Sequence, residues 1–307
     1  MKVKKIKVYD KDPDSGVDNE YPTNDLSFRQ PALHMIVGVR NSGKSFSASK
    51  ILAQEMKNKT FDVVYMITPS FNSNRAYFGR YVKPENVYEP TKESISLVIQ
   101  RVETDRDEWE QYLEELAMYH QFKKDMKKKS IEDIDEGLML LYYENGFFNK
   151  KPQWKYEKEE PPKSLLILDD CLGSDAILQS SGLTKIATLN RHIAPLKEDY
   201  KGRSACGLAV MMLSQSYRMS NGISRVLREN LSLITLFKNK QEKQIDAIRE
   251  ELANVVDIDL FNKAYEYATS ERYGNLTVDF KPKHPALTFR KNLNEAIIFD
   301  ELNREIK

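Results

Sequence analysis

Short apolar runs recur along the chain, each bounded by polar or turn-forming residues and separated by longer stretches. The runs that predict buried strands are 33–37, 63–67, 165–168, 208–213 and 231–237. Because consecutive residues in each run are apolar, both faces of these strands should be covered, which is typical of a mostly parallel sheet between helical layers. The pattern therefore predicts an α/β fold, a three-layer sandwich with a mostly parallel central sheet.

The stretches around these strands divide the chain into three parts. Residues 1–30 are polar and begin with an alternating Lys–Val–Lys–Lys–Ile–Lys–Val run, which predicts an N-terminal arm or edge strand. Residues 31–240 form the expected core. Residues 241–307 should complete the same domain with a C-terminal helix, a β-hairpin around 281–285 and a closing helix over 294–306.

Helical spacing is clearest after the first strand and in a charged insert. Residues 45–56 predict a helix that starts directly behind the first strand. The insert, 92–160, should hold a helix over 94–122 and a looser one over 133–160. The first of these begins acidic and is followed by Lys123, Lys124, Lys127, Lys128 and Lys129. That order complements the helix dipole, and the lysines could also contact a phosphate backbone.

The sequence VGVRNSGKS at 37–45 joins the first predicted strand to this helix. It matches G-x-x-x-x-G-K-[ST]. In that motif, glycines let successive backbone N–H groups face one phosphate, the lysine reaches the outer phosphates and the hydroxyl binds Mg²⁺. The helix start adds a positive dipole end. The segment predicts a nucleotide site made by Gly38, Asn41, Ser42, Gly43, Lys44, Ser45 and Phe46, with Ser45 as a metal ligand.

Two further predicted strands end in polar residues at the same edge of the sheet. Asp169, after the 165–168 strand, would hold Mg²⁺ opposite Ser45, and Asp170 would orient or deprotonate an attacking water. Gln215, after the 208–213 strand, lies where ligands of open α/β sheets bind and could sense a γ-phosphate. With Lys44, these residues form the expected catalytic centre.

Arginines gather around the last of these strands, at Arg191, Arg218, Arg225 and Arg228. Phosphoryl transfer leaves charge on the γ-phosphate oxygens, and an arginine from a neighbouring subunit can stabilise that charge. The group therefore supplies candidates for a trans-acting arginine.

Composition argues against a zinc enzyme, a covalent hydrolase and a membrane-spanning protein, but it does not distinguish between the kinds of nucleotide-dependent protein. Lys and Arg number 47 against 46 Asp and Glu in 307 residues, a net charge of +1, so any basic surface must be local. Cys171 and Cys206 have no metal-ligand spacing, and the four histidines form no zinc pattern or covalent-hydrolase arrangement. We see neither a signal peptide nor a bilayer-spanning run, so a soluble, intracellular protein is expected.

The ordered set GVRNSGKS, VVYMITPS, LLILDD, NRH, MMLSQS, RVLREN and ITLF spans 33–237. It resembles the genome-packaging ATPases of poxviruses, giant viruses and virophages, in the FtsK–HerA clan of P-loop translocases. The resemblance implies ATP and Mg²⁺ as cofactors and a homo-oligomeric ring that drives double-stranded DNA into a preformed capsid. It further implies contact with capsid portal or vertex proteins, no required membrane, and a place in the host cytoplasm, the viral factory or the virion.

Carried over by position, Lys44 and Ser45 would be the Walker A pair and Asp169 the Mg²⁺ aspartate. Gln215 would be the sensor. Arg228 is the first candidate for the trans-acting arginine, with Arg191 and Arg225 in reserve. The match departs from the family at Asp170, where many relatives have the longer glutamate, and in the 92–160 insert, which carries none of the motifs.

Two other readings stay open. DCLG at 170–173 fits D-x-x-G and NKQE at 239–242 nearly fits N-K-x-D, which together with the P-loop would mark a GTPase. That reading gives Gln215 and the arginines no role, and Glu242 is longer than the aspartate that guanine recognition requires. Alternatively, the site could bind nucleotide only to hold an assembly together.

Overall fold

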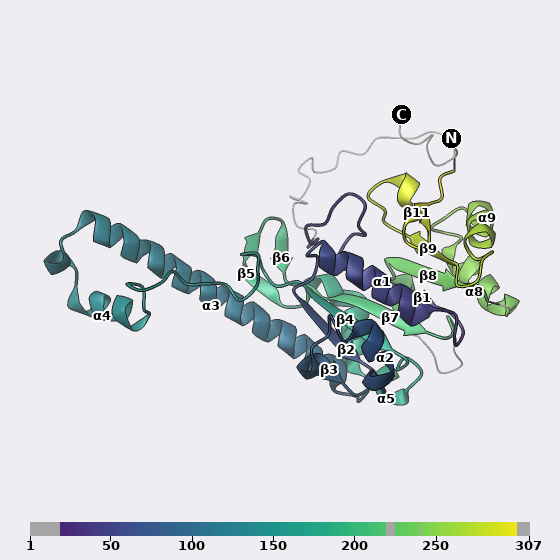
Figure 1. The fold of residues 1–307 in the computed structure, drawn as a ribbon, viewed down its shortest axis with the longest axis horizontal. Helices are drawn as coiled ribbons and strands as arrows, with labels where there is room; N and C mark the ends of the chain where they lie inside the picture. The colour runs from purple at the N-terminus through teal and green to yellow at the C-terminus, as the bar shows by residue number, and fades with distance from the viewer. Residues whose placement is uncertain (1–18, 219–224, 240, 300–307) are drawn as a thin grey trace, which may run out of the picture.

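The computed structural model describes residues 19–218, 225–239 and 241–299. Within them the main sheet has nine strands: β1 Leu33–Val37, β2 Val63–Ile67, β3 Val87–Tyr88, β4 Ser164–Asp169, β7 Ala209–Ser214, β8 Leu233–Phe237, β9 Asn275–Asp279, β10 Phe289–Lys291 and β11 Glu295–Ala296. Their order is β11-β10-β9-β8-β1-β7-β4-β2-β3 (Figure 1). The six strands from β8 to β3 are parallel, and β9, β10 and β11 add an antiparallel end. The predicted fold class is confirmed.

The pleat of the buried strands divides the core between two helical layers. Met35 and Ile36, adjacent on β1, belong to different hydrophobic clusters on opposite faces of the sheet. The cluster around Ile36 includes residues of α1 Lys44–Lys57 and α2 Phe71–Phe78. The cluster around Met35 includes residues of α3 Ser94–Lys128, α6 Ser181–Leu189, α8 Glu242–Leu252 and α9 Ile258–Ala268. Helices on both faces explain why these strands read as continuous apolar runs.

Shorter elements connect the layers. They are α5 Asp175–Leu178, α7 Arg225–Glu229, and the 3₁₀ turns η1 Pro84–Asn86, η2 Ile131–Asp133, η3 Asn190–His192 and η4 Pro285–Leu287. No helix among the described residues combines the length and the apolar character needed to cross a membrane.

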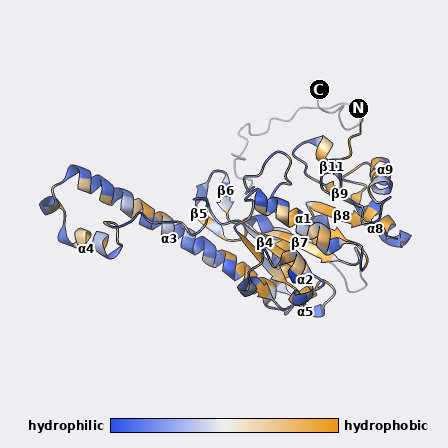
Figure 2. Ribbon diagram, in the orientation of Figure 1, coloured by the Kyte–Doolittle hydropathy of each residue, from blue (hydrophilic) through white to orange (hydrophobic). Residues whose placement is uncertain are grey.

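The outer part of α3 and the helix α4 Glu136–Glu144 form an arm, residues 113–151, that extends away from the sheet (Figure 1). Most of the residues along it are hydrophilic (Figure 2). At its far end Phe122, Tyr142 and Phe147 make a small separate core. The predicted 94–122 helix continues to Lys128.

The second insert helix was predicted too long. Of residues 133–160, only Glu136–Glu144 are α-helical. The chain turns at Gly146, with φ 69°, and prolines at 152, 161 and 162 then disfavour further helix.

The sequence reading also failed at the C-terminus and missed a hairpin. The β9–β10 hairpin is present, but residues 294–299 form β11 and an extended segment in place of the closing helix, because Ile297 N–H donates to Phe289 C=O. The rest of that predicted helix lies outside the described residues. The predicted N-terminal strand, at 2–8, also lies outside the described residues. A second sheet, β5 Pro195–Tyr200 with β6 Arg203–Ala205, was not predicted.

Candidate functional site

The P-loop connects the carboxyl end of β1 to the first residue of α1. Gly43 has φ 100° and Asn41 has φ 62°, so the backbone is left-handed at two positions within the loop. Gly38 leaves no room for a side chain, since a Cβ there would lie 2.4 Å from Ser42 Oγ and 3.0 Å from Phe237 Cβ. The loop therefore curls tightly in front of the α1 N-terminus, where backbone N–H groups and the helix dipole favour an anion.

Lys44 lies inside this loop. Its Nζ donates to the carbonyl oxygens of Gly38, at 2.7 Å, and Val39, at 3.2 Å. Burial lowers the pKa of Lys44, while the carboxylates of Asp170 and Asp169 act in the opposite direction. The ammonium group is thus held in the loop, in reach of any phosphate that the loop binds.

Asp169, the last residue of β4, supplies a buried carboxylate beside the loop. Its Oδ2 accepts a 2.5 Å hydrogen bond from Nδ2 of Asn74, on α2. Burial raises the pKa of Asp169 to about 6; Asp170 adds to the rise, and Asn74 and Lys44 oppose it. Oxygen ligands suit Mg²⁺, so Asp169 and the Ser45 hydroxyl fit the two protein ligands of a metal that keeps water and phosphate oxygens as the others.

Asp170 and Gln215 meet at the edge of the site. Asp170 has φ 48°, a left-handed conformation that Asp tolerates, and this turns the chain immediately after β4. Nε2 of Gln215, which follows β7, donates to Asp170 Oδ1 at 3.4 Å. Because β7 lies between β1 and β4, its end brings Gln215 between the lysine and the two aspartates.

One cavity of about 1010 Å³ collects these groups at the carboxyl ends of β1, β4 and β7. It is lined by Arg40, Asn41, Ser42, Gly43, Lys44, Ser45, Phe46, Tyr77, Asp169, Asp170, Gln215, Arg272 and Tyr273. Of the residues predicted from sequence, Gly38 lies just behind the lining, and Arg228 lies elsewhere. Among the described residues there is no cluster of three or more His, Cys, Asp or Glu side chains that could hold a metal ion.

Sequence reasoning missed Arg40 within the P-loop and four residues outside it: Asn74, Tyr77, Arg272 and Tyr273. Asn74 and Tyr77 are three positions apart on α2 and so share a face of that helix. The Arg272 guanidinium lies 4.8 Å from the Tyr273 ring centre, and Tyr273, with φ 67°, packs near Gly43. The one local signal was the Tyr–Gly turn at 273–274.

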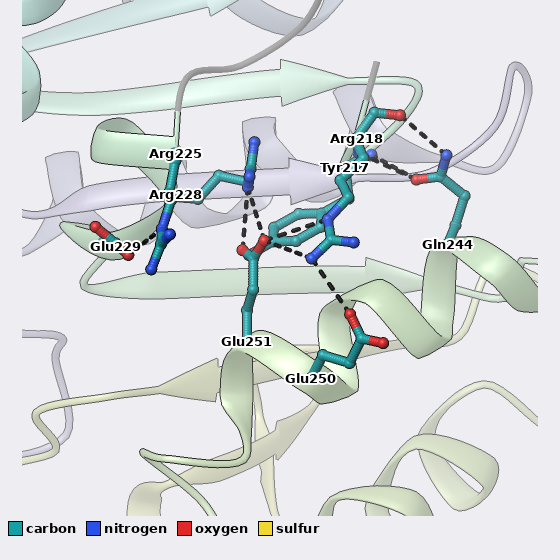
Figure 3. Close-up of polar contacts among 8 residues, drawn as sticks. All are labelled: Tyr217, Arg218, Arg225, Arg228, Glu229, Gln244, Glu250 and Glu251. Atoms are coloured by element: carbon teal, nitrogen blue, oxygen red, sulfur yellow. Dashed lines mark hydrogen bonds and ion pairs between the residues drawn. The ribbon is translucent and has the colours of Figure 1, made fainter. Parts of the chain in front are cut away.

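Three of the candidate arginines, Arg218, Arg225 and Arg228, do not line the cavity and lie in a separate charged region (Figure 3). Arg228, on α7, donates through Nε to both carboxylate oxygens of Glu251, at 3.0 and 3.2 Å, and its side chain is 13% exposed. Arg218 bonds the same carboxylate at 3.0 Å. Arg225 is 82% exposed and bonds Glu229 one helical turn away. Arg228, the first candidate for the trans-acting arginine, is thus held in an ion pair, whereas Arg225, a reserve candidate, lies on the surface.

Arg191 lies at the other end of the sheet. It belongs to η3, whose residue Asn190 donates through Nδ2 to the carbonyls of Pro31 and Leu208. Those two residues precede β1 and β7, whereas the cavity lies beyond the carboxyl ends of the same strands.

No family model matches the chain, and no curated protein matches it in sequence. Among solved structures it is similar to the genome packaging NTPase B204 from Sulfolobus turreted icosahedral virus 2, in complex with ATP-gammaS (14% identity, TM-score 0.40, 85% of this chain and 96% of that chain). It is also similar to the pCW3 conjugation coupling protein TcpA in monomer form with ATPgS (16% identity, TM-score 0.44, 90% of this chain and 65% of that chain). Identities and scores of this size do not establish a function, which has to come from the site. The P-loop between a buried strand and a helix, in a mostly parallel sheet, is the fold of a P-loop NTPase.

Proposed function

We propose that this chain hydrolyses MgATP and uses the energy to move double-stranded viral DNA into a preformed capsid. The observation that carries the hydrolytic part is the convergence of Lys44, Ser45, Asp169, Asp170 and Gln215 on one cavity. These residues lie at or just beyond the carboxyl ends of β1, β7 and β4, which are neighbours in the sheet although they are far apart in sequence.

Each residue has a distinct role in this proposal. Loop N–H groups and Lys44 bind the phosphates, and Ser45 and Asp169 hold Mg²⁺, which supplies neutralisation of the phosphate charge. Asp170 orients an attacking water or accepts its proton. Gln215, already within reach of Asp170, binds the γ-phosphate and reports its loss. The aromatic face of Tyr273, at the rim of the loop, is positioned to pack against the nucleoside.

The DNA-moving part of the proposal rests on the ordered motif set of 33–237 and not on the geometry of the cavity. By that resemblance, the working form is a homo-oligomeric ring around duplex DNA. It would contact portal or vertex proteins of the capsid and act in the host cytoplasm or viral factory.

Geometry disfavours the GTPase alternative. Asn239 Oδ1 accepts a 2.9 Å hydrogen bond from the backbone N–H of Gln241, within its own turn. Neither Asn239 nor Glu242 lines the cavity, where the corresponding motif would have to contact guanine. A purely structural nucleotide site would need neither Asp170 nor Gln215, so hydrolysis remains the better account.

The Lys44→Ala variant tests the hydrolytic part. Removing the ammonium group from the loop should abolish turnover while circular dichroism and the unfolding midpoint stay close to wild type. Lys57→Ala is the matched control, because Lys57 is an exposed lysine in the last turn of the same helix and does not line the cavity. Wild-type turnover by the Lys44→Ala protein would remove this loop from the mechanism.

A further inference from the structure

Helix α8 presents two polar side chains to the segment that leaves β7. Gln244 and Glu251 are seven residues apart, two helical turns, and so lie on one face of the helix. The adjoining face carries Ile245, Ile248 and Leu252, which are buried in the main core. The helix is therefore docked by its apolar residues, and its polar face is available for another task. We call Gln244 and Glu251 the α8 clamp (Figure 3).

Gln244 binds the backbone of this segment much as a neighbouring strand would. Its Oε1 accepts from the N–H groups of Tyr217, at 3.1 Å, and Arg218, at 3.2 Å. Its Nε2 donates to the Arg218 carbonyl at 3.1 Å. The Gln244 side-chain amide thus uses both its acceptor and its donor on the backbone of two consecutive residues. These hydrogen bonds fix the path of the chain at Tyr217 and Arg218.

Glu251 binds the side chains of the same two residues. It accepts from Tyr217 Oη at 2.6 Å and from Arg218 Nη2 at 3.0 Å. It also accepts from Nε of Arg228, whose guanidinium lies 5.7 Å from the Tyr217 ring centre. One carboxylate therefore connects the segment after β7 to the arginine on α7.

The clamped residues, Tyr217 and Arg218, lie two and three positions after the sensor Gln215. Ser214 Oγ donates to the Ser216 carbonyl at 2.6 Å, and Ser216 Oγ donates to the Arg218 carbonyl at 2.8 Å. Gln215 thus lies in a short hydrogen-bonded segment fixed at one end by β7 and at the other by the α8 clamp. A shift of that second end would move the Gln215 amide relative to Asp170, its hydrogen-bond partner.

We propose that Gln244 and Glu251 are positioning residues that hold Gln215 in its catalytic place and join it to Arg228 through helix α8. The proposal rests on the proposed function, since it assigns Gln215 a part in turnover. It adds that the site extends to a helix that contributes nothing to the nucleotide cavity. A change at the γ-phosphate would then pass from Gln215 through α8 to the arginine.

Gln244→Met tests this, because methionine keeps the length and bulk of the side chain and loses its hydrogen bonds. We expect kcat for ATP to fall roughly tenfold or more while the dissociation constant for a fluorescent ATP analogue stays within about threefold, since the P-loop is untouched. Gln241→Met is the matched control: it lies at the exposed start of the same helix and should behave as wild type. A wild-type kcat in Gln244→Met would overturn the proposal.

A double-mutant cycle separates positioning from a general loss of stability. If Gln244 acts through Gln215, adding Gln244→Met to Gln215→Ala should lower kcat little further. Effects that multiply would show that Gln244 acts by another route and would contradict the proposal.

Hydrogen exchange gives a readout that does not depend on turnover. The amides of Tyr217 and Arg218 should exchange faster in Gln244→Met, while those of β7 keep their protection. Unchanged exchange at both amides would mean that the clamp does not hold this segment in solution. Absence of ATP hydrolysis by the wild-type protein would instead refute the proposed function and leave the exchange result interpretable by itself.

Discussion

Asp169 is the residue at which function and stability conflict most directly. A carboxylate at the end of a buried strand loses its hydration, and burial raises its pKa to about 6, well above the ordinary value. One hydrogen bond from Asn74 and the charge of Lys44 offset only part of that cost. A metal that binds between Asp169 and Ser45 would supply the missing compensation.

Asp169→Asn should therefore stabilise the protein in the absence of Mg²⁺ and nucleotide. The raised pKa means that the wild-type free energy of unfolding falls as pH rises from about 4 to about 6, and that the cost is complete above pH 6. The Asp169→Asn variant has no ionisable group at this position and avoids this loss in the free energy of unfolding, which is about 2–3 kcal/mol for a pKa shift of this size. Urea unfolding should show a more stable variant at pH 7.5 and nearly equal proteins at pH 4.

The comparison is internally controlled. Asp279 is a second buried carboxyl whose pKa is raised to about 6, mainly by burial, and it is present in both proteins. Its contribution cancels in the difference between them. A difference that does not change with pH would contradict the account of Asp169.

The residues of the site fall into two groups. Some follow from the order of strand ends in the sequence, and the others are brought to the site only by tertiary packing. Lys44, Ser45 and Asp169 lie next to strand ends in a recognisable order, so the sequence was sufficient to predict that they meet. Asn74 and Tyr77 come from a short helix without a clear pattern, and Arg272 and Tyr273 come from a turn more than 200 residues after the P-loop. Only the tertiary packing of α2 and of the α9–β9 turn brings these four residues to the loop.

At the scale of elements, the arm is a long helix stabilised at two places. Near its base, Trp109 and Trp154 pack edge to face with ring centres 5.1 Å apart. At its tip, Phe122 contacts Tyr142 at 5.2 Å between centres, and Tyr142 Oη donates to Asp125. Lysines in the last turn of α3 complement the helix dipole, and Lys129 pairs with Asp125, so helix stabilisation is a sufficient reason for them.

Phe122→Ala should unfold the tip of the arm and leave the sheet intact. The loss of this aromatic side chain costs about 3–5 kcal/mol, and the small tip core has few other residues to absorb it. Hydrogen exchange in α4 should rise sharply while protection in β1 and β7 stays at wild-type levels. Leu113→Ala, at a position that is 38% exposed, is the control and should change little. Equal loss of protection in arm and sheet would show that the two unfold as one unit.

Strands could be predicted from the sequence where burial of both faces gives a clear run of apolar residues. The five core strands lie within two residues of their predicted limits because both faces of each are covered. The hairpin of β5 and β6 was missed because β5 is largely exposed and polar and β6 has only three residues, and its Lys–Gly turn at 201–202 was the one cue. The closing helix was wrong because pairing with β10 overrode the local pattern over 294–299.

At the scale of the whole molecule, the positions of Arg225 and Arg228 bear on whether one copy of the chain acts on the nucleotide of a neighbouring copy. Arg225 and Arg228 do not line the cavity of their own chain, so an arginine from this group would act on the nucleotide of a neighbouring copy. Arg228 would have to leave Glu251 to do so, whereas Arg225 is mostly exposed. The role of Arg228 therefore stays a prediction, with Arg225 as its rival.

Mixed assemblies distinguish the two. Arg228→Ala and Lys44→Ala proteins should each be inactive, and mixing them should restore part of the ATP hydrolysis, because a Lys44→Ala subunit can supply its arginine to a neighbour with an intact P-loop. The same mixture made with Arg225→Ala is the parallel test. Recovery with only one of the two arginine variants identifies the residue that acts in trans; recovery with neither removes both from that role.

Steady-state hydrolysis of ATP and of GTP by the purified protein, each with and without duplex DNA, tests the proposed DNA-moving ATPase activity most directly. We expect a strong preference for ATP and a rate that rises when duplex DNA is added. Preference for GTP with no response to DNA would contradict it and return the motifs at 170–173 and 239–242 to the centre of the function.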